Sequence, residues 1–326
     1  MTDPGSGLEA AWYRGSPWLW LLLPLEVLFR SVAAVRRWFY RSGLLSTYRA
    51  ARPVVVVGNI TVGGTGKTPV IIALVEALQA QGLNPGVVSR GYGASGDQFP
   101  HLVTSASNAR QCGDEPLLIH RRTGVPCAVD PDRGRAVRAL VEAHPVDLVL
   151  CDDGLQHYAL QRDYEIALLD AQRGTGNGHC LPMGPLREPA SRLGSVDRVL
   201  YRGSDNVTSG VSYRPVAWIS VATGEERPLS TINDVEGVGA VVGIGQPNHI
   251  FATLEQLGIA FTRHVFPDHH QYVEEDFAPL GARTILMTEK DAVKCGNLAG
   301  PDAWYLRIDA QLPKEVVDEV AALARS

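Results

Sequence analysis

A glycine-rich loop between an apolar run and a helical pattern constrains the fold of this chain more than any other feature. Residues 53–68 read PVVVVGNITVGGTGKT, and the four valines at 54–57 predict a buried strand of a parallel sheet. Pro69 then opens the segment 69–81, whose apolar residues recur at helical spacing. The order of strand, glycine loop and helix is the context that a phosphate-binding loop requires.

The residues of this loop suit the phosphates of a nucleotide. Glycines let the backbone turn several N–H groups towards phosphate oxygens, and the N-terminus of the following helix adds partial positive charge. A lysine here reaches the β- and γ-phosphates, and the hydroxyl after it binds Mg²⁺. Thr61 replaces the first glycine of the G-x-x-x-x-G-K-[ST] pattern, so we expect Gly63 and Gly64 to supply the flexibility. The predicted ATP-binding residues are Gly63, Gly64, Thr65, Gly66, Lys67 and Thr68, with Thr68 also a predicted metal ligand.

A second strand ends in two adjacent carboxylates. Residues 146–154 read VDLVLCDDG, which places Asp152 and Asp153 at the end of a buried run. In P-loop proteins an acid at such a strand end holds Mg²⁺ directly or through water. Because the carboxyl ends of parallel strands meet at one edge of a sheet, this pair and the glycine loop are expected to converge. The residues leave open which aspartate lies nearer Mg²⁺, and an ordinary Asp-Gly turn is the alternative.

The N-terminal segment indicates contact with a membrane. The apolar run at 17–29 is shorter than the roughly 20 residues of a spanning helix, and no signal-peptide cleavage site follows it. A helix over 25–41 carries Leu25, Leu28, Val32, Val35 and Phe39 on one side and Glu26, Arg30, Arg37 and Arg41 on the other. An amphipathic helix rich in arginine and tryptophan is typical of the headgroup layer of an anionic membrane. A helix that packs on its own domain is the alternative.

Alternating strand and helix patterns predict an α/β fold, with a mostly parallel sheet like that of P-loop NTPases. We expect strands at 54–57, 86–90, 147–151, 165–170, 197–201, 216–221, 238–244, 283–288 and 304–308, and helices at 69–81, 132–143, 248–257 and 313–325. The expected division is a membrane-associating helical segment at 1–50, a P-loop kinase domain at 51–222 and a smaller α/β lobe at 223–326.

The formal net charge of −5 argues against nucleic acid as a partner, because nucleic-acid-binding proteins usually carry an excess of basic residues.

Seven short segments together resemble the tetraacyldisaccharide 4′-kinase family, the lipid A kinases of Gram-negative bacteria. They are GNITVGGTGKTP (58–69), SRGYG (89–93), GDEP (113–116), CDDGLQH (151–157), PMGPLREP (182–189), FPDHH (266–270) and TEKDAVK (288–294). The resemblance implies transfer of the γ-phosphate of ATP, with Mg²⁺, to the 4′-hydroxyl of a lipid-linked disaccharide, tetraacyldisaccharide 1-phosphate, to give lipid IVA. It also implies a peripheral or monotopic location on the cytoplasmic face of the inner membrane.

The resemblance further assigns roles to single residues outside the glycine loop. Asp114, in GDEP, matches the base that activates the acceptor hydroxyl, and His269 matches a histidine that orients this base, with His270 as the open alternative. Arg187 would neutralise charge on the transferred phosphoryl group, and Glu188 would bind Mg²⁺ or its waters. Because Asp114 and the histidines belong to different predicted lobes, closure of the cleft between the lobes would assemble the site.

Two other functions stay open on the residues alone. One is a P-loop kinase for a soluble small metabolite, which would have no use for the amphipathic N-terminus. The other is a nucleotide-dependent, membrane-associated switch protein. A GTPase-type switch needs an N-K-x-D motif, and the nearest stretch, TEKD at 288–291, does not match it.

Overall fold

The computed structural model describes residues 7–96, 98–232 and 235–325. Its strands are β1 (Val54–Gly58), β2 (Pro85–Ser89), β3 (His101–Leu102), β4 (Cys127–Val129), β5 (Leu148–Asp152), β6 (Tyr164–Asp170), β7 (Arg198–Arg202), β8 (Gly210–Ser220), β9 (Glu226–Arg227), β10 (Val238–Val242), β11 (Phe261–Val265), β12 (Thr284–Thr288) and β13 (Ala303–Gln311). Its α-helices are α1 (Leu8–Arg14), α2 (Leu23–Arg41), α3 (Lys67–Ala80), α4 (Ala109–Cys112), α5 (Asp114–Thr123), α6 (Arg133–Ala143), α7 (Asn248–Gln256), α8 (Glu274–Phe277), α9 (Glu289–Cys295) and α10 (Lys314–Arg325).

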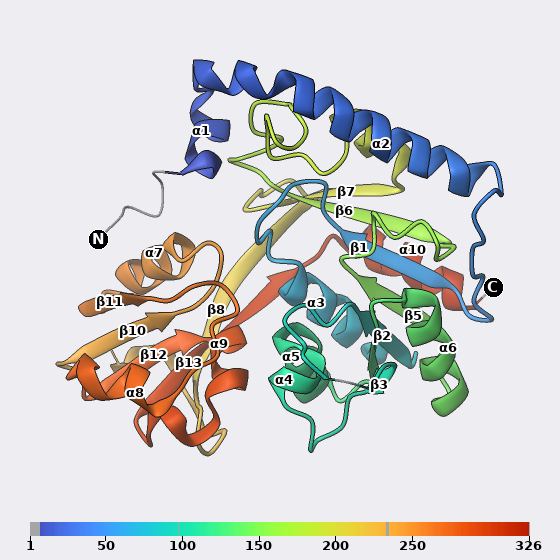
Figure 1. Cartoon of the computed structure of the whole chain (residues 1–326). Coiled ribbons are helices and arrows are strands. Elements are labelled where there is room, and N and C mark those ends of the chain that lie inside the picture. Colours follow the sequence, from blue (N-terminus) through green and yellow to red (C-terminus); the bar gives the residue numbers. More distant parts are fainter. Residues whose placement is uncertain (1–6, 97, 233–234, 326) are drawn as a thin grey trace.

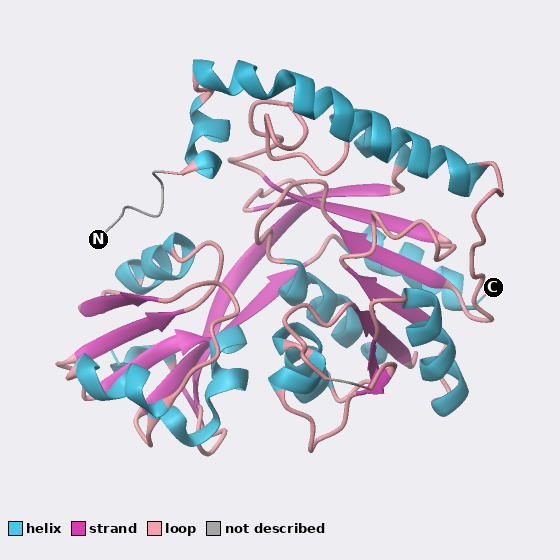
Figure 2. Cartoon of the chain, in the orientation of Figure 1, coloured by secondary structure: helices cyan, strands magenta, loops and turns pink. Residues whose placement is uncertain are grey.

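One sheet runs through both halves of the molecule (Figures 1 and 2). Its strand order is β11-β10-β12-β13-β8-β7-β6-β1-β5-β2-β4-β3, with β9 paired to β8. Neighbours are parallel except where β13 meets β8, β3 meets β4 and β9 meets β8. The long strands β8 and β13 join the P-loop half to the second half. The expected mostly parallel α/β architecture is thereby confirmed.

The valine run of β1 explains why the P-loop half is covered on both faces. Val55 and Val57 point into a buried cluster that contains residues of α3, α5 and α10. Val54 and Val56 point into the opposite cluster, which contains residues of α6. Side chains of a strand alternate between the two faces of a sheet, so a strand buried on both faces reads as a continuous apolar run.

Several helices and strands were not predicted from the sequence patterns. The helices α5 and α9 were not expected, and neither were β4 and β11, while β8 begins at Gly210 and not at 216. The three residues of β4 are too few for a periodic pattern, and β11 is a half-exposed edge strand without an apolar run. The helix after the glycine loop begins at Lys67, so Pro69 is its third residue. The first four N–H groups of a helix have no partner within the helix, so the N–H that proline lacks removes no helical hydrogen bond.

The end of the chain returns to the P-loop half. In α10, Val316 and Val320 belong to the same buried cluster as Val70 and Leu74 of α3. The division at residue 223 stays a prediction, but the segment after β13 packs with the first half and not with the second. A second lobe therefore consists of the chain between β8 and β13, with its own core on both sides of β10.

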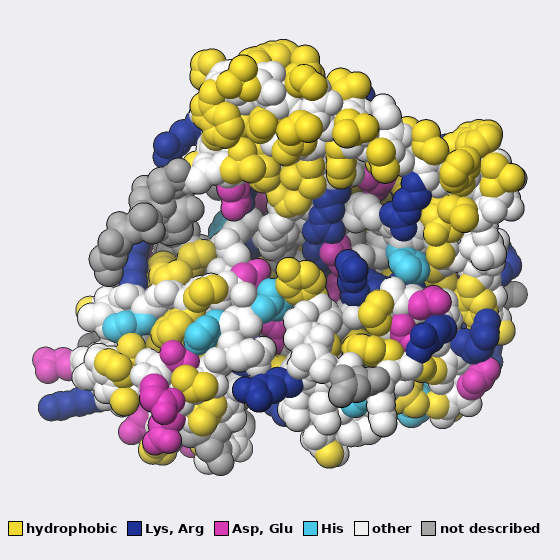
Figure 3. Space-filling view, in the orientation of Figure 1, with side chains coloured by type: hydrophobic (Ala, Val, Ile, Leu, Met, Phe, Trp, Pro, Cys, Tyr) yellow, Lys and Arg dark blue, Asp and Glu magenta, His cyan; other side chains and the backbone are white. Residues whose placement is uncertain are grey.

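The N-terminal helix lies along the outer side of the P-loop half (Figure 1). A 3₁₀ turn at Pro17–Leu22 continues into α2, and together they form a helical stretch, Pro17–Arg41, long and apolar enough by length and composition to cross a membrane. This stretch is longer than the apolar run at 17–29, which was expected to be too short to span. Hydrophobic side chains gather on the outer side of this helix (Figure 3), where Leu28 and Val32 are each 61% exposed.

Candidate functional site

The glycine loop joins β1 to α3 in the conformation that phosphate binding needs. Gly63 and Gly66 have φ values of 95° and 80°, a region that residues with a side chain rarely adopt. Gly64, expected to share this task, is not among the positive-φ glycines, and a Cβ there would meet nothing within 4 Å. Thr61, at the position of the usual first glycine, is buried and forms an isolated β-bridge with Leu186. An extended residue with a side chain therefore fits at that position.

Lys67, Asp153 and Arg187 form one chain of charges beside the loop. The Lys67 ammonium lies 3.4 Å from Oδ1 of Asp153 and 3.3 Å from Oδ1 of Asn59. The Arg187 guanidinium donates to Oδ2 of Asp153 at 2.9 Å. Burial favours a higher pKa for Asp153, but the charges of Lys67 and Arg187 outweigh burial and hold its pKa below the usual range. Asp153 thus holds both cations beside the glycine loop.

Asp152 has the opposite environment from its neighbour. It is the last residue of β5 and is fully buried, with Oδ2 accepting a hydrogen bond from Ser89 at 3.4 Å. Its Oδ1 has no hydrogen-bond partner among the described residues. Burial raises the pKa of Asp152, as do the nearby charges of Glu115 and Asp153, although Lys67 and Arg133 lower it. A carboxylate with a free oxygen and a raised pKa is suited to a cation.

Glu188 is held by protein groups on both of its oxygens. The Tyr158 hydroxyl donates to Oε1, and the Gln156 amide donates to Oε2 at 3.0 Å. Gln156 also donates to the Asn59 carbonyl at 3.1 Å and accepts from Arg187 at 3.3 Å. Glu188 therefore fastens the segment that carries Arg187, and its predicted role as a metal ligand stays a prediction.

Asp114 meets His269 across the space between the two lobes. Asp114 is the first residue of α5 and is 4% exposed, while His269 lies in the loop after β11 with a φ of 60°. Nδ1 of His269 lies 3.0 Å from Oδ1 and 3.1 Å from Oδ2 of Asp114. His270 instead bonds to Asp276 at 2.8 Å. The structure thus brings together Asp114 and His269, and it turns His270 away.

Two lysines of α9 add positive charge to the Asp114–His269 pair. The Lys290 ammonium lies 3.8 Å and the Lys294 ammonium 3.9 Å from Oδ2 of Asp114. Burial favours a higher pKa for Asp114, but the hydrogen bond from His269 and the charges of Lys290, His269 and Lys294 hold its pKa below the usual range. Asp114 is therefore ionised at neutral pH.

A cleft of about 570 Å³ separates the glycine loop from the second lobe. Lys67 and Thr68 line one side, and Asp268 and Lys290 line the other. Lys290 also contacts Asp114, so a residue beside the predicted base lines the same cleft as the predicted phosphate loop. Lys67 contacts Asp153, which in turn contacts Arg187, so these two residues are connected to the cleft.

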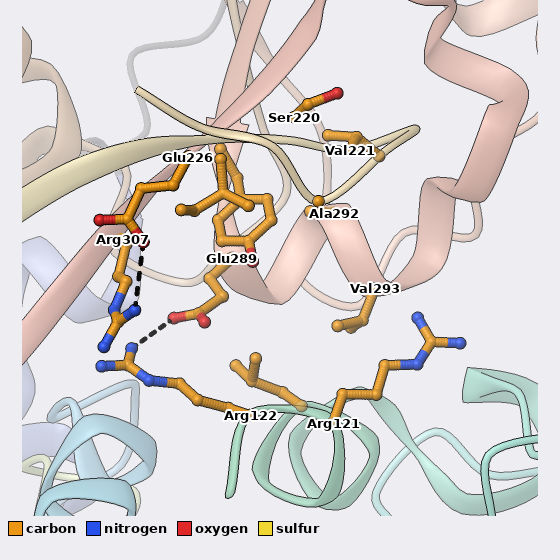
Figure 4. A pocket seen from close by; sticks show the side chains of 13 residues that line it. Arg121, Arg122, Ser220, Val221, Glu226, Glu289, Ala292, Val293 and Arg307 are labelled. Atoms are coloured by element: carbon orange, nitrogen blue, oxygen red, sulfur yellow. Dashed lines mark hydrogen bonds and ion pairs between the residues drawn. The ribbon is translucent and has the colours of Figure 1, made fainter. Parts of the chain in front are cut away.

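A smaller pocket of about 360 Å³ lies at the other end of α5 (Figure 4). There Arg122 donates to Glu289, the first residue of α9, at 3.0 Å, and Arg307 lies 3.7 Å from Glu226. These opposite charges pair across the wall of the pocket. The contact between Arg122 and Glu289 joins α5 to α9 at the end remote from Asp114.

Three further residues act on the site without having been predicted. Asn59 contacts Lys67, as described above. The Tyr213 hydroxyl of β8 donates to the Gly66 carbonyl at 2.8 Å. Lys294 supports Asp114. Asn59 and Lys294 both belong to segments that carry the family resemblance, and this membership could have marked them as candidate site residues. Tyr213 lies outside those segments, so nothing in the sequence marked it in this way.

Comparison with known proteins gives one consistent result. The model of the LpxK family, described as tetraacyldisaccharide-1-P 4′-kinase, matches residues 18–325. A tetraacyldisaccharide 4′-kinase of Azotobacter vinelandii is 55% identical over 98% of this chain and 97% of its own length. One of Pseudomonas aeruginosa is 53% identical over 93% of this chain and 92% of its own. The crystal structure of LpxK from Aquifex aeolicus in complex with ATP is similar with a TM-score of 0.79 and 25% identity, over 94% of this chain and 98% of that one.

Proposed function

We propose that this chain, which belongs to the tetraacyldisaccharide 4′-kinase family, transfers the γ-phosphate of ATP to the 4′-hydroxyl of tetraacyldisaccharide 1-phosphate. The product would be lipid IVA, a precursor of lipid A. The observation that carries this proposal is the cleft lined by the glycine loop and by Lys290, whose ammonium lies 3.8 Å from Oδ2 of Asp114 and 3.4 Å from Nε2 of His269. A kinase needs these two parts together, because the phosphoryl donor and the activated acceptor must lie side by side.

In the proposed mechanism, Asp114 accepts the proton of the 4′-hydroxyl as its oxygen attacks the γ-phosphorus and the bond to ADP breaks. An aspartate is a weak base, so its contribution depends on orientation, which the two contacts with His269 supply. Lys67 and Arg187, which both contact Asp153 beside the glycine loop, would neutralise the negative charge that develops on the transferred group and on the leaving oxygen. Their present partner, Asp153, keeps both cations in place before ATP binds.

The residues of the site also suit Mg²⁺. The free Oδ1 of buried Asp152 and the Thr68 hydroxyl at the start of α3 are oxygen donors of the kind that Mg²⁺ takes. No group of three or more His, Cys, Asp or Glu side chains within the described ranges is arranged to hold a metal ion. This fits Mg²⁺, which binds through one or two protein groups and the phosphates of the nucleotide. When bound, the ion would neutralise charge on the β- and γ-phosphates.

We further propose that the chain lies on the cytoplasmic face of the inner membrane, held there by α2 and not spanning the bilayer. The apolar side of α2 is exposed at Leu25, Leu28, Val32 and Val35, each at 51–61%. Its other side is fastened to the protein at Glu26, which is 1% exposed. A helix that keeps these contacts lies parallel to the membrane surface, with its apolar side in the headgroup layer. A lipid acceptor would reach the cleft from that side.

Point substitutions test this location better than deletion of the N-terminus. Trp12 and Leu19 belong to a buried cluster with Met183, against which Val62 of the glycine loop packs. Deleting them would damage the site together with the membrane contact. The variant Leu28→Glu/Val32→Glu should instead leave the fold intact and abolish sedimentation with vesicles of phosphatidylethanolamine and phosphatidylglycerol. Unchanged sedimentation would refute the membrane role of α2.

The activity is tested by transfer of labelled γ-phosphate from ATP to tetraacyldisaccharide 1-phosphate in mixed micelles. The wild type should transfer, whereas Lys67→Ala and Asp114→Ala should each lose on the order of 100-fold or more in rate. The variant Lys314→Ala, at the start of α10, is the matched lysine control. Failure of the wild type to transfer, despite ATP binding, would refute the lipid acceptor and favour a soluble one.

A further inference from the structure

Glu26 is the one fully buried residue of α2, on a helix whose other residues are exposed or half-buried. Its Oε2 lies 2.8 Å from Nδ1 of His179, and its Oε1 accepts from the backbone N–H of Cys180 at 2.9 Å. Arg30 adds a contact at 3.6 Å. A carboxylate out of water is costly unless both oxygens are bonded, so this contact is specific. The bonded carboxylate of Glu26 faces the loop that contains His179 and Cys180, on the side of α2 away from Leu28 and Val32.

The segment that Glu26 holds is a compact loop at 179–187. The backbone N–H of Leu186 donates to the His179 carbonyl at 3.1 Å, and that of Leu181 donates to the Leu186 carbonyl at 2.9 Å. A Cβ on Gly184 would lie 2.2 Å from the His179 carbonyl oxygen, so the loop closes as tightly as glycine allows. The loop is therefore closed by its own backbone hydrogen bonds.

The opposite side of this loop is bonded to the glycine loop. The backbone N–H of Val62 donates to the Pro185 carbonyl at 2.8 Å, and that of Arg187 donates to the Ile60 carbonyl at 2.7 Å. A second contact with the N-terminus supports the arrangement, since the Trp12 indole donates to the Pro182 carbonyl at 3.0 Å. The loop at 179–187 thus lies between the N-terminal helices and the glycine loop and contacts both.

The last residue of this loop is Arg187, which reaches Asp153 and, through it, Lys67. We infer that Glu26 is a positioning residue: by fixing the loop at 179–187 against α2, it sets the phosphate loop and Arg187 in the geometry needed for phosphoryl transfer. The expected effect of Glu26 on the reaction rate rests on the proposed function. A displacement of about 1 Å of groups that hold a phosphoryl group lowers rates by up to on the order of 100-fold.

The test compares Glu26→Ala and Glu26→Gln with the membrane-side variant Leu28→Glu/Val32→Glu. Glu26→Ala should lower kcat by about tenfold or more in mixed micelles, with the KM for the lipid acceptor and sedimentation with vesicles of phosphatidylethanolamine and phosphatidylglycerol unchanged. Glu26→Gln keeps an acceptor for the Cys180 N–H and should restore part of the rate. The membrane-side variant should lose sedimentation with these vesicles, which Glu26→Ala should keep.

Amide hydrogen exchange gives a readout that does not depend on the reaction. Peptides covering 58–66 and 179–188 should exchange at least about tenfold faster in Glu26→Ala than in the wild type, and a peptide covering 148–152 should not change. Unchanged exchange in both loops, or a wild-type kcat in Glu26→Ala, would overturn the inference. If the wild type fails to transfer phosphate, the proposed function falls, and the exchange result still decides whether Glu26 holds the two loops.

Discussion

Nδ1 of His269 lies within 3.1 Å of both carboxylate oxygens of Asp114, although 154 residues separate them in the chain. Asp114 begins a helix of the P-loop half, and His269 belongs to the second lobe. The pair exists only while the two halves are together. Opening of the cleft would therefore remove the orienting contact from the proposed base, and closure would restore it.

The first prediction concerns this pair. Asp114→Asn keeps the shape of the side chain but cannot accept the proton, so kcat should fall on the order of 100-fold or more. His269→Asn should lower kcat less, by about tenfold, because Asp114 remains but is less well oriented. The control His270→Asn should be close to the wild type, since His270 bonds to Asp276. The double variant Asp114→Asn/His269→Asn should be no slower than Asp114→Asn alone, and independent, additive losses would contradict a joint role.

The sequence predicted those parts of the site that lie in local patterns. The glycine loop and the Asp152–Asp153 pair each follow a strand, and the parallel sheet brings strand ends together. Asp114 and His269 came from the family resemblance alone, because no local pattern relates residues so far apart. The choice between His269 and His270 needed coordinates, since it depends on a φ of 60° that turns one ring towards α5.

Other features could not be predicted because they depend on which neighbours a side chain meets. Glu26 was placed correctly on the polar side of the helix, yet its burial arises from His179 and Cys180, far along the chain. Lys294 falls in a recognised segment, but its role depends on the helix α9, which the sequence did not indicate. Glu188, predicted as a metal ligand, is bonded on both oxygens by Tyr158 and Gln156, and no local pattern indicates these contacts.

The second prediction separates the two adjacent aspartates. Asp152→Asn should raise the Mg²⁺ concentration for half-maximal activity by about tenfold or more, because it changes the buried carboxylate with a free oxygen. Asp153→Asn should mainly lower kcat, because Lys67 and Arg187 lose the charge that holds them. Titration of Mg²⁺ at saturating ATP measures both, with the exposed Asp302→Asn as control. A shifted Mg²⁺ requirement in Asp153→Asn alone would reverse the assignment.

The third prediction concerns the stability of the second lobe. The Lys294 ammonium lies 2.9 Å from Asp291, and both side chains are almost completely buried. Lys294→Met leaves two buried carboxylates, Asp291 and Asp114, without this cation, so the free energy of unfolding should fall by about 3 kcal/mol. Lys290→Met, at a more exposed position, should cost about 1 kcal/mol or less. Urea unfolding at pH 7.5 measures the free energy of unfolding of both variants. Equal losses would show that the burial of Lys294 does not determine how much this lysine stabilises the protein.

The last prediction is a pH dependence of stability that originates at His157. Burial, followed by the charges of Arg133, Arg162 and Arg36, lowers the pKa of His157 to about 4, although Asp132 raises it. Between pH 6.5 and pH 4 the unfolded chain therefore binds a proton at this residue that the folded protein does not, so stability falls as pH falls through this range. His157→Gln removes that difference, and its Tm should fall less steeply than that of the wild type. The exposed His144→Gln should follow the wild type, and parallel curves for all three proteins would show that His157 does not stay neutral in the fold.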